Sequence, residues 1–238
     1  MTIETVVGLL AETYRLLRPE TILHADELMK ERRTNEELRN QLLYTADGLI
    51  YLLQGENRTP TLAITRGSSN PLFQDFKIDE YCQQLRENKN YRPTPEETSR
   101  ALQAEDTVLV DLTKLELQGD DQESRHLTIN TQNYNGLNSE QQKLAERVYG
   151  KGQDFGLTMR ILADAGILDT RVFVLNPDYV CIGAKENSLG RASWLSSFSI
   201  SSYFSAYGRI VNYRDHTRGV RRDDVARSAA SESEVPRV

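Results

Sequence analysis

Apolar residues recur at helical spacing in several segments of the chain. Segment 2–18 has valines and leucines three and four residues apart and is closed by Pro19, so we expect a helix there. A second helix is predicted over about residues 26–53, with a solvated first half and a buried second half. Four further helices are predicted over residues 76–88, 94–105, 138–150 and 154–166. Thr94 followed by Glu97 predicts a capping box at the start of the helix over 94–105.

Shorter apolar runs between these helices predict strands. They cover residues 60–67, 106–117, 125–130 (expected to pair with 106–117) and 170–183, the last interrupted by Asn176-Pro177. The element order predicts an α+β fold. We expect a mainly helical region over residues 1–104 and a domain of short irregular strands and two helices over 105–222. The polar tail over 223–238 is expected to be disordered.

Charge is distributed unevenly along the 238 residues, whose net charge is −6. Residues 185–222 hold seven lysines and arginines against Glu186 and Asp215, so this segment carries about +5 and the remainder about −11. The acidic balance argues against a chain that binds nucleic acid or a membrane surface throughout. No apolar run approaches the ~20 residues that span a bilayer. The first residues lack a basic leader, so a cytoplasmic protein is expected, with display on a virion or cell surface left open.

Candidate catalytic and metal-binding residues are few. Cys82 and Cys181 have no metal-ligand spacing, and two free thiols are favoured over a disulfide, with Cys181 on a buried strand. The three histidines, His24, His126 and His216, lie in separate segments without neighbouring ligands, so we expect no metal site and no cofactor. A calcium requirement stays open. "YGKGQDFG" lacks the spacing of a phosphate-binding loop and is interpreted as a joint between two helices.

The most unusual stretch is "GRASWLSSFSISSYFSAYGRIVNYRDHTRGVR" over residues 190–221. Seven of its thirteen residues from Ser193 to Ser205 are serine, and large aromatic rings stand among them. Some positions suit a packed scaffold: Trp194 is the only tryptophan of the chain, and buried arginines need a carboxylate or carbonyl partner. The residues between mix small polar, aromatic and charged types, a composition typical of recognition surfaces.

The order of these scaffold positions resembles the C-terminal part of the formylglycine-generating-enzyme type of C-type lectin fold. Its framework, close to R-G-G-S-W, then R, then G-F-R, is matched by a set in which Ala192 replaces a glycine and Val220 an aromatic residue. The matching framework residues are Arg191, Ser193, Trp194, Arg209, Gly219 and Arg221. The mixed stretch resembles the variable region of proteins diversified by retroelements, in which adenine-templated codons are rewritten. The resemblance covers about residues 172–222, and 105–222 by element order.

This resemblance implies a ligand-binding protein whose variable segment, about residues 193–217, recognises a variable macromolecule, most simply another protein. The implied ligand-binding residues are Ser197, Ser199, Ile200, Ser201, Tyr203, Tyr207, Ile210, Asn212, Tyr213, Arg214, Asp215, His216 and Thr217. Formylglycine-generating enzymes use a pair of thiols in the C-terminal core, whereas residues 182–238 contain no cysteine. We therefore expect no enzymatic activity.

Other interpretations stay open. The serine-rich stretch can be an exposed, irregular sheet edge without a ligand. Its cations and aromatic rings also suit nucleic acid, through phosphate contacts and base stacking. A third alternative is an enzyme of the formylglycine-generating type that lacks its thiols. The sequence does not indicate the oligomeric state.

Overall fold

The computed structural model describes residues 22–41, 43–73, 78–88, 90–195, 203–206 and 218–219. Their helices are α2 (Ala25–Glu31), α3 (Glu36–Arg39), α4 (Ile78–Asn88), α5 (Pro95–Gln103), α6 (Ser139–Tyr149), α7 (Gln153–Asp164) and α8 (Pro177–Gly183). The strands are β1 (Leu43–Gln54), β2 (Thr59–Thr65), β3 (Val108–Asp111), β4 (Ser124–Asn130), β5 (Asp169–Leu175), β6 (Leu189–Leu195), β7 (Tyr203–Ala206) and β8 (Arg218–Gly219). The predicted α+β class is confirmed.

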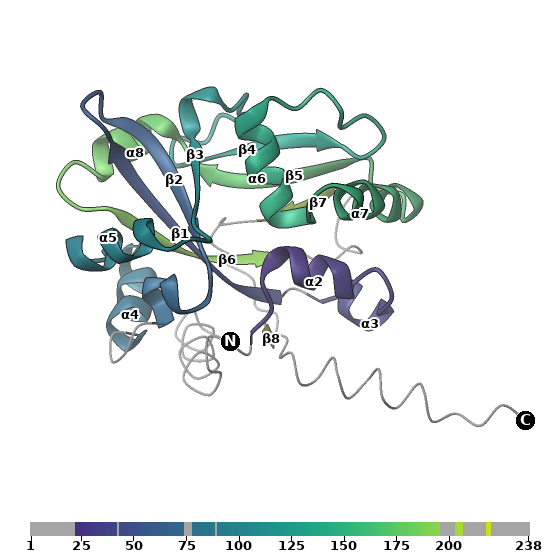
Figure 1. Ribbon diagram of the computed structural model, residues 1–238, viewed down its shortest axis with the longest axis horizontal. Coiled ribbons are helices and arrows are strands. Elements are labelled where there is room, and N and C mark those ends of the chain that lie inside the picture. The colour runs from purple at the N-terminus through teal and green to yellow at the C-terminus, as the bar shows by residue number, and fades with distance from the viewer. Residues whose placement is uncertain are drawn as a thin grey trace, which may run out of the picture.

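The eight described strands form one mixed sheet in the order β3-β2-β1-β6-β7-β5-β4, with β8 on β1 (Figure 1). Most neighbours are antiparallel, but β7 runs parallel to β5 and β8 parallel to β1. A single residue pair, Leu195 with Ala206, joins β6 to β7. The sheet therefore consists of two blocks that meet at this pair.

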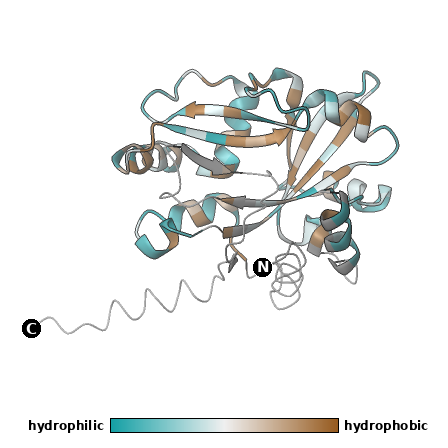
Figure 2. Cartoon of the chain, turned by 180° about the vertical axis from the view of Figure 1, so that it is seen from behind, coloured by the Kyte–Doolittle hydropathy of each residue, from teal (hydrophilic) through white to brown (hydrophobic). Residues whose placement is uncertain are grey.

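The two faces of the β1–β2 hairpin pack against different partners. Leu49 and Tyr51 belong to the main core, which α2, α6, α7 and α8 also supply. Ile50 points to the opposite face, where it packs with Ala63 and with Ala101 of α5. Figure 2 shows apolar residues concentrated on the strands between these layers. Because β1 is buried on both faces, its apolar run is nearly continuous.

This burial explains the main error of the sequence-based prediction. The helix expected over residues 26–53 is wrong in its second half, because residues 43–54 are β1 and only α2 and α3 are helical. A continuous apolar run has no period that separates a buried strand from a buried helix. Within residues 1–104, where a mainly helical region is expected, the described residues also supply the strands β1 and β2, which pair with β6 and β3 in the same sheet.

Two smaller corrections concern strands. The strand predicted over 170–183 ends at Leu175, because Asn176 caps α8 and Pro177 occupies its first turn. Strand β4 pairs along its length with β5, and it meets the segment before it only at the bridge between Gln118 and His126, one residue past 106–117. By contrast, the helices α4, α5, α6 and α7 and the strand β2 are confirmed, including the Thr94–Glu97 capping box. The segments 2–18 and 223–238 lie outside the described residues.

Candidate functional site

Most of the proposed ligand-binding residues lie outside the described part of the chain. Tyr203 is the exception; it begins β7, where its backbone lies beside Asp169 of β5. The residues outside are Ser197, Ser199, Ile200, Ser201, Tyr207, Ile210, Asn212, Tyr213, Arg214, Asp215, His216 and Thr217, together with the framework residues Arg209 and Arg221. What the structure describes is the scaffold from which this segment departs and to which it returns.

The points of departure and return lie in one row across the sheet. Ala206 is paired with Leu195, Leu195 with Leu43, and Leu43 with Arg218. Leu43, Leu195 and Ala206 are fully buried. Residues 207–217 therefore begin and end on the same row of paired strands. We call these four residues the anchor row.

The distance from one end of the anchor row to the other is short compared with the length of residues 207–217, which connect those ends. Neighbouring strands lie about 4.8 Å apart, so three spacings separate Ala206 from Arg218 by roughly 14 Å. Four or five extended residues would cover that distance at about 3.3 Å per residue. The chain has eleven residues between the two ends. The connection is thus longer than closure alone requires.

Arg191 of β6 is a buried framework residue and 3 % exposed. Its Nε donates to Asn90 Oδ1 at 2.7 Å and its Nη1 to Ser124 Oγ at 3.1 Å, while Nη2 forms an ion pair with Glu123. The expectation that a buried arginine here is paired with a carboxylate is confirmed. Because Glu123 and Ser124 belong to the start of β4 and the turn before it, Arg191 ties the two blocks of the sheet together.

Ser193, two residues further along β6, is completely buried. Its hydroxyl donates to the backbone oxygen of Asp47 at 2.8 Å and also contacts the hydroxyl of Thr45. These partners lie in β1 where its register with β6 shifts, between Tyr44 and Gly48. The irregularity turns backbone and side-chain oxygens of β1 toward Ser193. Ser193 thereby fixes β6 just before the anchor row.

The carboxylate of Asp47 completes this buried polar cluster. It accepts hydrogen bonds from the Ala25 amide at 2.8 Å and the Thr45 hydroxyl at 3.1 Å, and it lies 3.2 Å from His24 Nδ1. Burial by itself raises the pKa of Asp47. The hydrogen bond and charge of His24, the charge of Arg66 and the hydrogen bond of the Ala25 amide together outweigh that effect and hold the pKa of Asp47 below its usual value. The ionised carboxylate therefore links α2 to β1.

Trp194 and Gly219 lie on opposite edges of β1 at the same position of that strand. Trp194 is paired with Tyr44 in the antiparallel β1–β6 ladder, and Gly219 is paired with the same residue in the parallel β1–β8 ladder. Two framework residues predicted from the sequence are thus brought to one position of β1. The side-chain packing expected for Trp194 lies outside what the structure describes.

The sequence-based reading missed His24, Asp47 and Glu123 as parts of this scaffold. The sequence presents His24 only as a possible metal ligand, and it places Asp47 in a predicted helix. Asp47 stands inside an apolar run of the sequence, and a buried carboxylate needs hydrogen-bond or charged partners. This position is the signal from which a buried polar cluster could be predicted. Glu123 lies in the acidic turn before β4, and its sequence environment gives no indication of an ion pair with Arg191.

The remaining candidates for chemistry are dispersed. Cys181 is a free thiol of intermediate exposure on α8, which corrects its expected position on a strand. His126 stacks at 5.2 Å on Phe173, and burial followed by the charge of Arg171 lowers its pKa. Within the described ranges, no group of three His, Cys, Asp or Glu side chains is arranged to hold a metal ion. The segment over 149–156 joins α6 to α7, which confirms its interpretation as a helix joint.

Among the described helices, none combines the length and the apolar character needed to cross a bilayer.

Comparison with known proteins yields little. No protein-family model matches the chain, and no curated protein matches it. One solved structure that is similar belongs to work on the accommodation of massive sequence variation in Nanoarchaeota by the C-type lectin fold. The two chains are 12 % identical, with 77 % of this chain and 80 % of the other covered and a TM-score of 0.49. A similarity of this degree carries no argument about this chain, so the case for its function depends on its own residues.

Proposed function

We propose that the chain is a non-enzymatic ligand-binding protein of the C-type lectin type, in which a constant scaffold presents residues 197–217 to a variable macromolecular ligand, most simply a protein. The segment is diversified by a retroelement, as the resemblance of its framework and its residue mixture implies. Its thirteen candidate binding residues supply adaptable hydrogen-bonding groups together with rigid tyrosine rings.

The anchor row is the observation that carries this proposal. A binding segment that tolerates many sequences needs ends that are held independently of what lies between them. Leu43, Leu195 and Ala206 are fully buried on strands from distant parts of the chain, and Arg218 is paired beside them. The contacts described above for Ser193 and Arg191 have partners that lie before residue 125. Of the anchor row, only Ala206 lies within residues 197–217, and it is not one of the thirteen candidate binding residues.

Two libraries of the full chain test this division. In the first library, the thirteen candidate positions are randomised. The second library randomises, in the same way, a smaller set of scaffold positions: Leu43, Arg191, Ser193, Leu195 and Ala206. We expect most members of the first library to unfold cooperatively near the temperature of the original chain, and most members of the second to be unfolded. Equal losses in both libraries would contradict the proposal.

The genetic part has its own test. An intact locus is expected to hold a near-copy of the 3′ coding segment that differs almost only at adenines, beside a reverse-transcriptase gene. Absence of such a copy removes diversification by a retroelement, although a fixed ligand-binding role would remain. Salt-dependent binding to mixed oligonucleotides by the original chain would instead favour the nucleic-acid alternative.

A further inference from the structure

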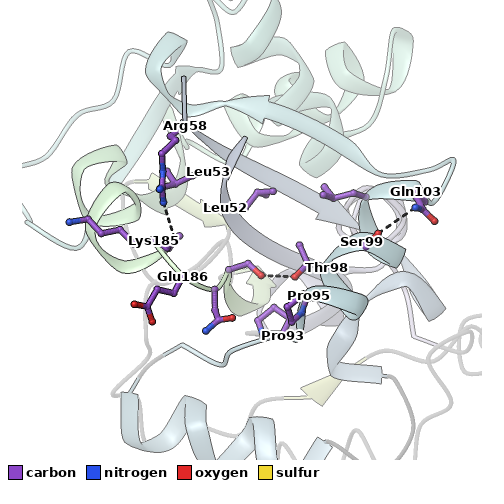
Figure 3. Close-up of a pocket in the computed structure, with 14 residues that line it drawn as sticks. Leu52, Leu53, Arg58, Pro93, Pro95, Thr98, Ser99, Gln103, Lys185 and Glu186 are labelled. Atoms are coloured by element: carbon purple, nitrogen blue, oxygen red, sulfur yellow. Dashed lines mark hydrogen bonds between the residues drawn. The ribbon is translucent and has the colours of Figure 1, made fainter. Parts of the chain in front are cut away.

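A cavity of about 660 Å³ opens at the end of β1 that lies opposite the anchor row. About ten residues of strand separate Leu53 from Leu43, which corresponds to roughly 30 Å. The wall consists of the β1–β2 hairpin, α5 with the segment before it, and residues 184–188 after α8 (Figure 3). The volume falls within the ~300–1,000 Å³ of pockets that hold small molecules. The cavity is therefore distant from the anchor row.

The floor and one side of the cavity are apolar. Leu52 and Leu53 of β1 are half-buried and border the cavity. As successive strand residues they lie on opposite faces, and Leu52 shares its apolar cluster with Leu102 of α5. Pro93 and Pro95 extend this surface at the start of α5. Three side chains hold residues 184–188 in place: the hydroxyls of Thr98 and Ser188 are 2.6 Å apart, Arg58 donates to the Lys185 oxygen at 2.8 Å, and Arg92 donates to the Asn187 oxygen at 3.3 Å. The wall formed by residues 184–188 is thus held in place without a ligand.

Arg58 is the cation that faces this cavity. Figure 3 shows its side chain reaching across the rim to the backbone of Lys185, whereas the charged ends of Lys185 and Glu186 point away from the cavity. A guanidinium has five N–H donors, and only one is used in the bond to Lys185. The remaining donors form the planar fork that carboxylates match with two parallel hydrogen bonds.

The backbone of Arg58 adds an independent observation. Its φ is +49°, in the left-handed region, and no other non-glycine residue of the described ranges has a positive φ. Glycine or asparagine would fill this last position of the hairpin turn with less strain. The arginine with this backbone conformation lies where its side chain borders the mouth of a cavity, and such outliers cluster at binding sites.

We propose that this cavity binds a small monocarboxylate with an apolar body, such as a medium-chain or aryl carboxylic acid. The apolar part lies over Leu52, Leu53 and Leu102, and the carboxylate takes two donors of Arg58. The charged lining residues, Arg58, Lys185 and Glu186, sum to a single positive charge, which suits a monoanion better than a phosphate dianion. The site does not depend on the proposed function of residues 197–217.

The test uses the full chain, with octanoate as the probe and octanol and octylamine as neutral and cationic controls of equal chain length. Binding is followed by the amide NMR shifts of Leu52, Leu53, Ser99 and Leu102. We expect octanoate to shift these amides saturably and at least ten times more tightly than either control. Equal binding of octanol, or no shift with millimolar octanoate, would overturn the proposal.

Two variants complete the test. Arg58→Gly suits the positive φ and is expected to keep or raise the melting temperature while it weakens octanoate binding at least tenfold. Ser99→Trp, placed on an exposed position of α5, is expected to fill the cavity and abolish binding with Arg58 intact. Arg160→Gln removes an exposed arginine of α7 and is the matched control, which should bind as the original chain does. Undiminished binding by either Arg58→Gly or Ser99→Trp would place the ligand elsewhere.

Discussion

Arg191 of β6 is ion-paired with Glu123, which precedes β4, so that one buried guanidinium joins the two blocks of the sheet. The same guanidinium holds Asn90 Oδ1 and Ser124 Oγ. The direct backbone connection between β6 and β7 is a single residue pair. The side-chain contacts of Arg191 therefore supply much of what fixes one block relative to the other.

Replacing this arginine should be costly. We expect Arg191→Ala to lower the free energy of unfolding by about 3 kcal/mol, because removal of one member of a buried pair leaves the other members without their partner. Arg191→Lys keeps the charge but cannot reach three acceptors at once, so its loss should be smaller but still measurable. Urea unfolding measures both. Arg160→Ala on the exposed face of α7 is the control and should change stability by less than ~0.5 kcal/mol. A loss no larger than that of the control would mean that Arg191 does not hold the two blocks together.

Gly190 illustrates how closely side chains can approach the sheet. The ring of Tyr91 lies over this glycine, and the two residues exchange backbone hydrogen bonds of 3.0 and 2.8 Å. A Cβ at position 190 would overlap the tyrosine ring. We expect Gly190→Ala to destabilise the protein by about 1–3 kcal/mol through overpacking.

A second substitution separates this cause from a general effect on β6. If the overlap with Tyr91 is responsible, the double variant Gly190→Ala/Tyr91→Ala should lose less stability than the sum of the two single variants. A double-mutant cycle by chemical denaturation measures this difference. Strict additivity would show that the ring and the glycine are independent.

Asp47 predicts a definite dependence of stability on pH. Its pKa in the folded protein lies below the value of about 3.9 expected in the unfolded chain. The ionised carboxylate therefore contributes its full stabilisation above pH ~4–5, and this contribution is lost as the pH falls through the folded-state pKa. Asp47→Asn should be less stable than the original chain at pH 7, and the difference should shrink as the pH is lowered below about 4. Unfolding curves at several pH values measure it; a difference that grows toward acid would contradict the charged role.

The division between scaffold and binding segment gives a fourth prediction. Substituting Tyr203, Tyr207 and Tyr213 with alanine should leave the melting temperature nearly unchanged while it weakens ligand binding, because a few aromatic anchors dominate recognition surfaces. Trp194→Ala should instead cost ~3–5 kcal/mol, as expected for truncation of a buried aromatic residue. Calorimetry on the four variants compares the two effects. Equal damage from both sets would mean that the division is misplaced.

Local signals predicted much of the fold. Helix α5 is predictable because Thr94 and Glu97 cap it within four residues, and α6 because apolar residues recur at helical spacing over residues 138–150. Strand β1 could not be predicted in this way, because its burial depends on α5 and the main core, which cover opposite faces. The need of Arg191 for a carboxylate was predictable from its type. Its choice of Glu123 was not, because that contact spans 68 residues of sequence.

The anchor row also has a consequence for folding. Its pairs join Leu43 to Leu195 and to Arg218, contacts between residues more than 150 positions apart. Long-range pairings of this kind carry the largest loop-closure cost and form late. We therefore expect the two ends of residues 207–217 to be fixed late in folding, so that altered sequences between them leave the earlier steps unchanged. Under this order of assembly, a new binding segment meets a scaffold that is already built.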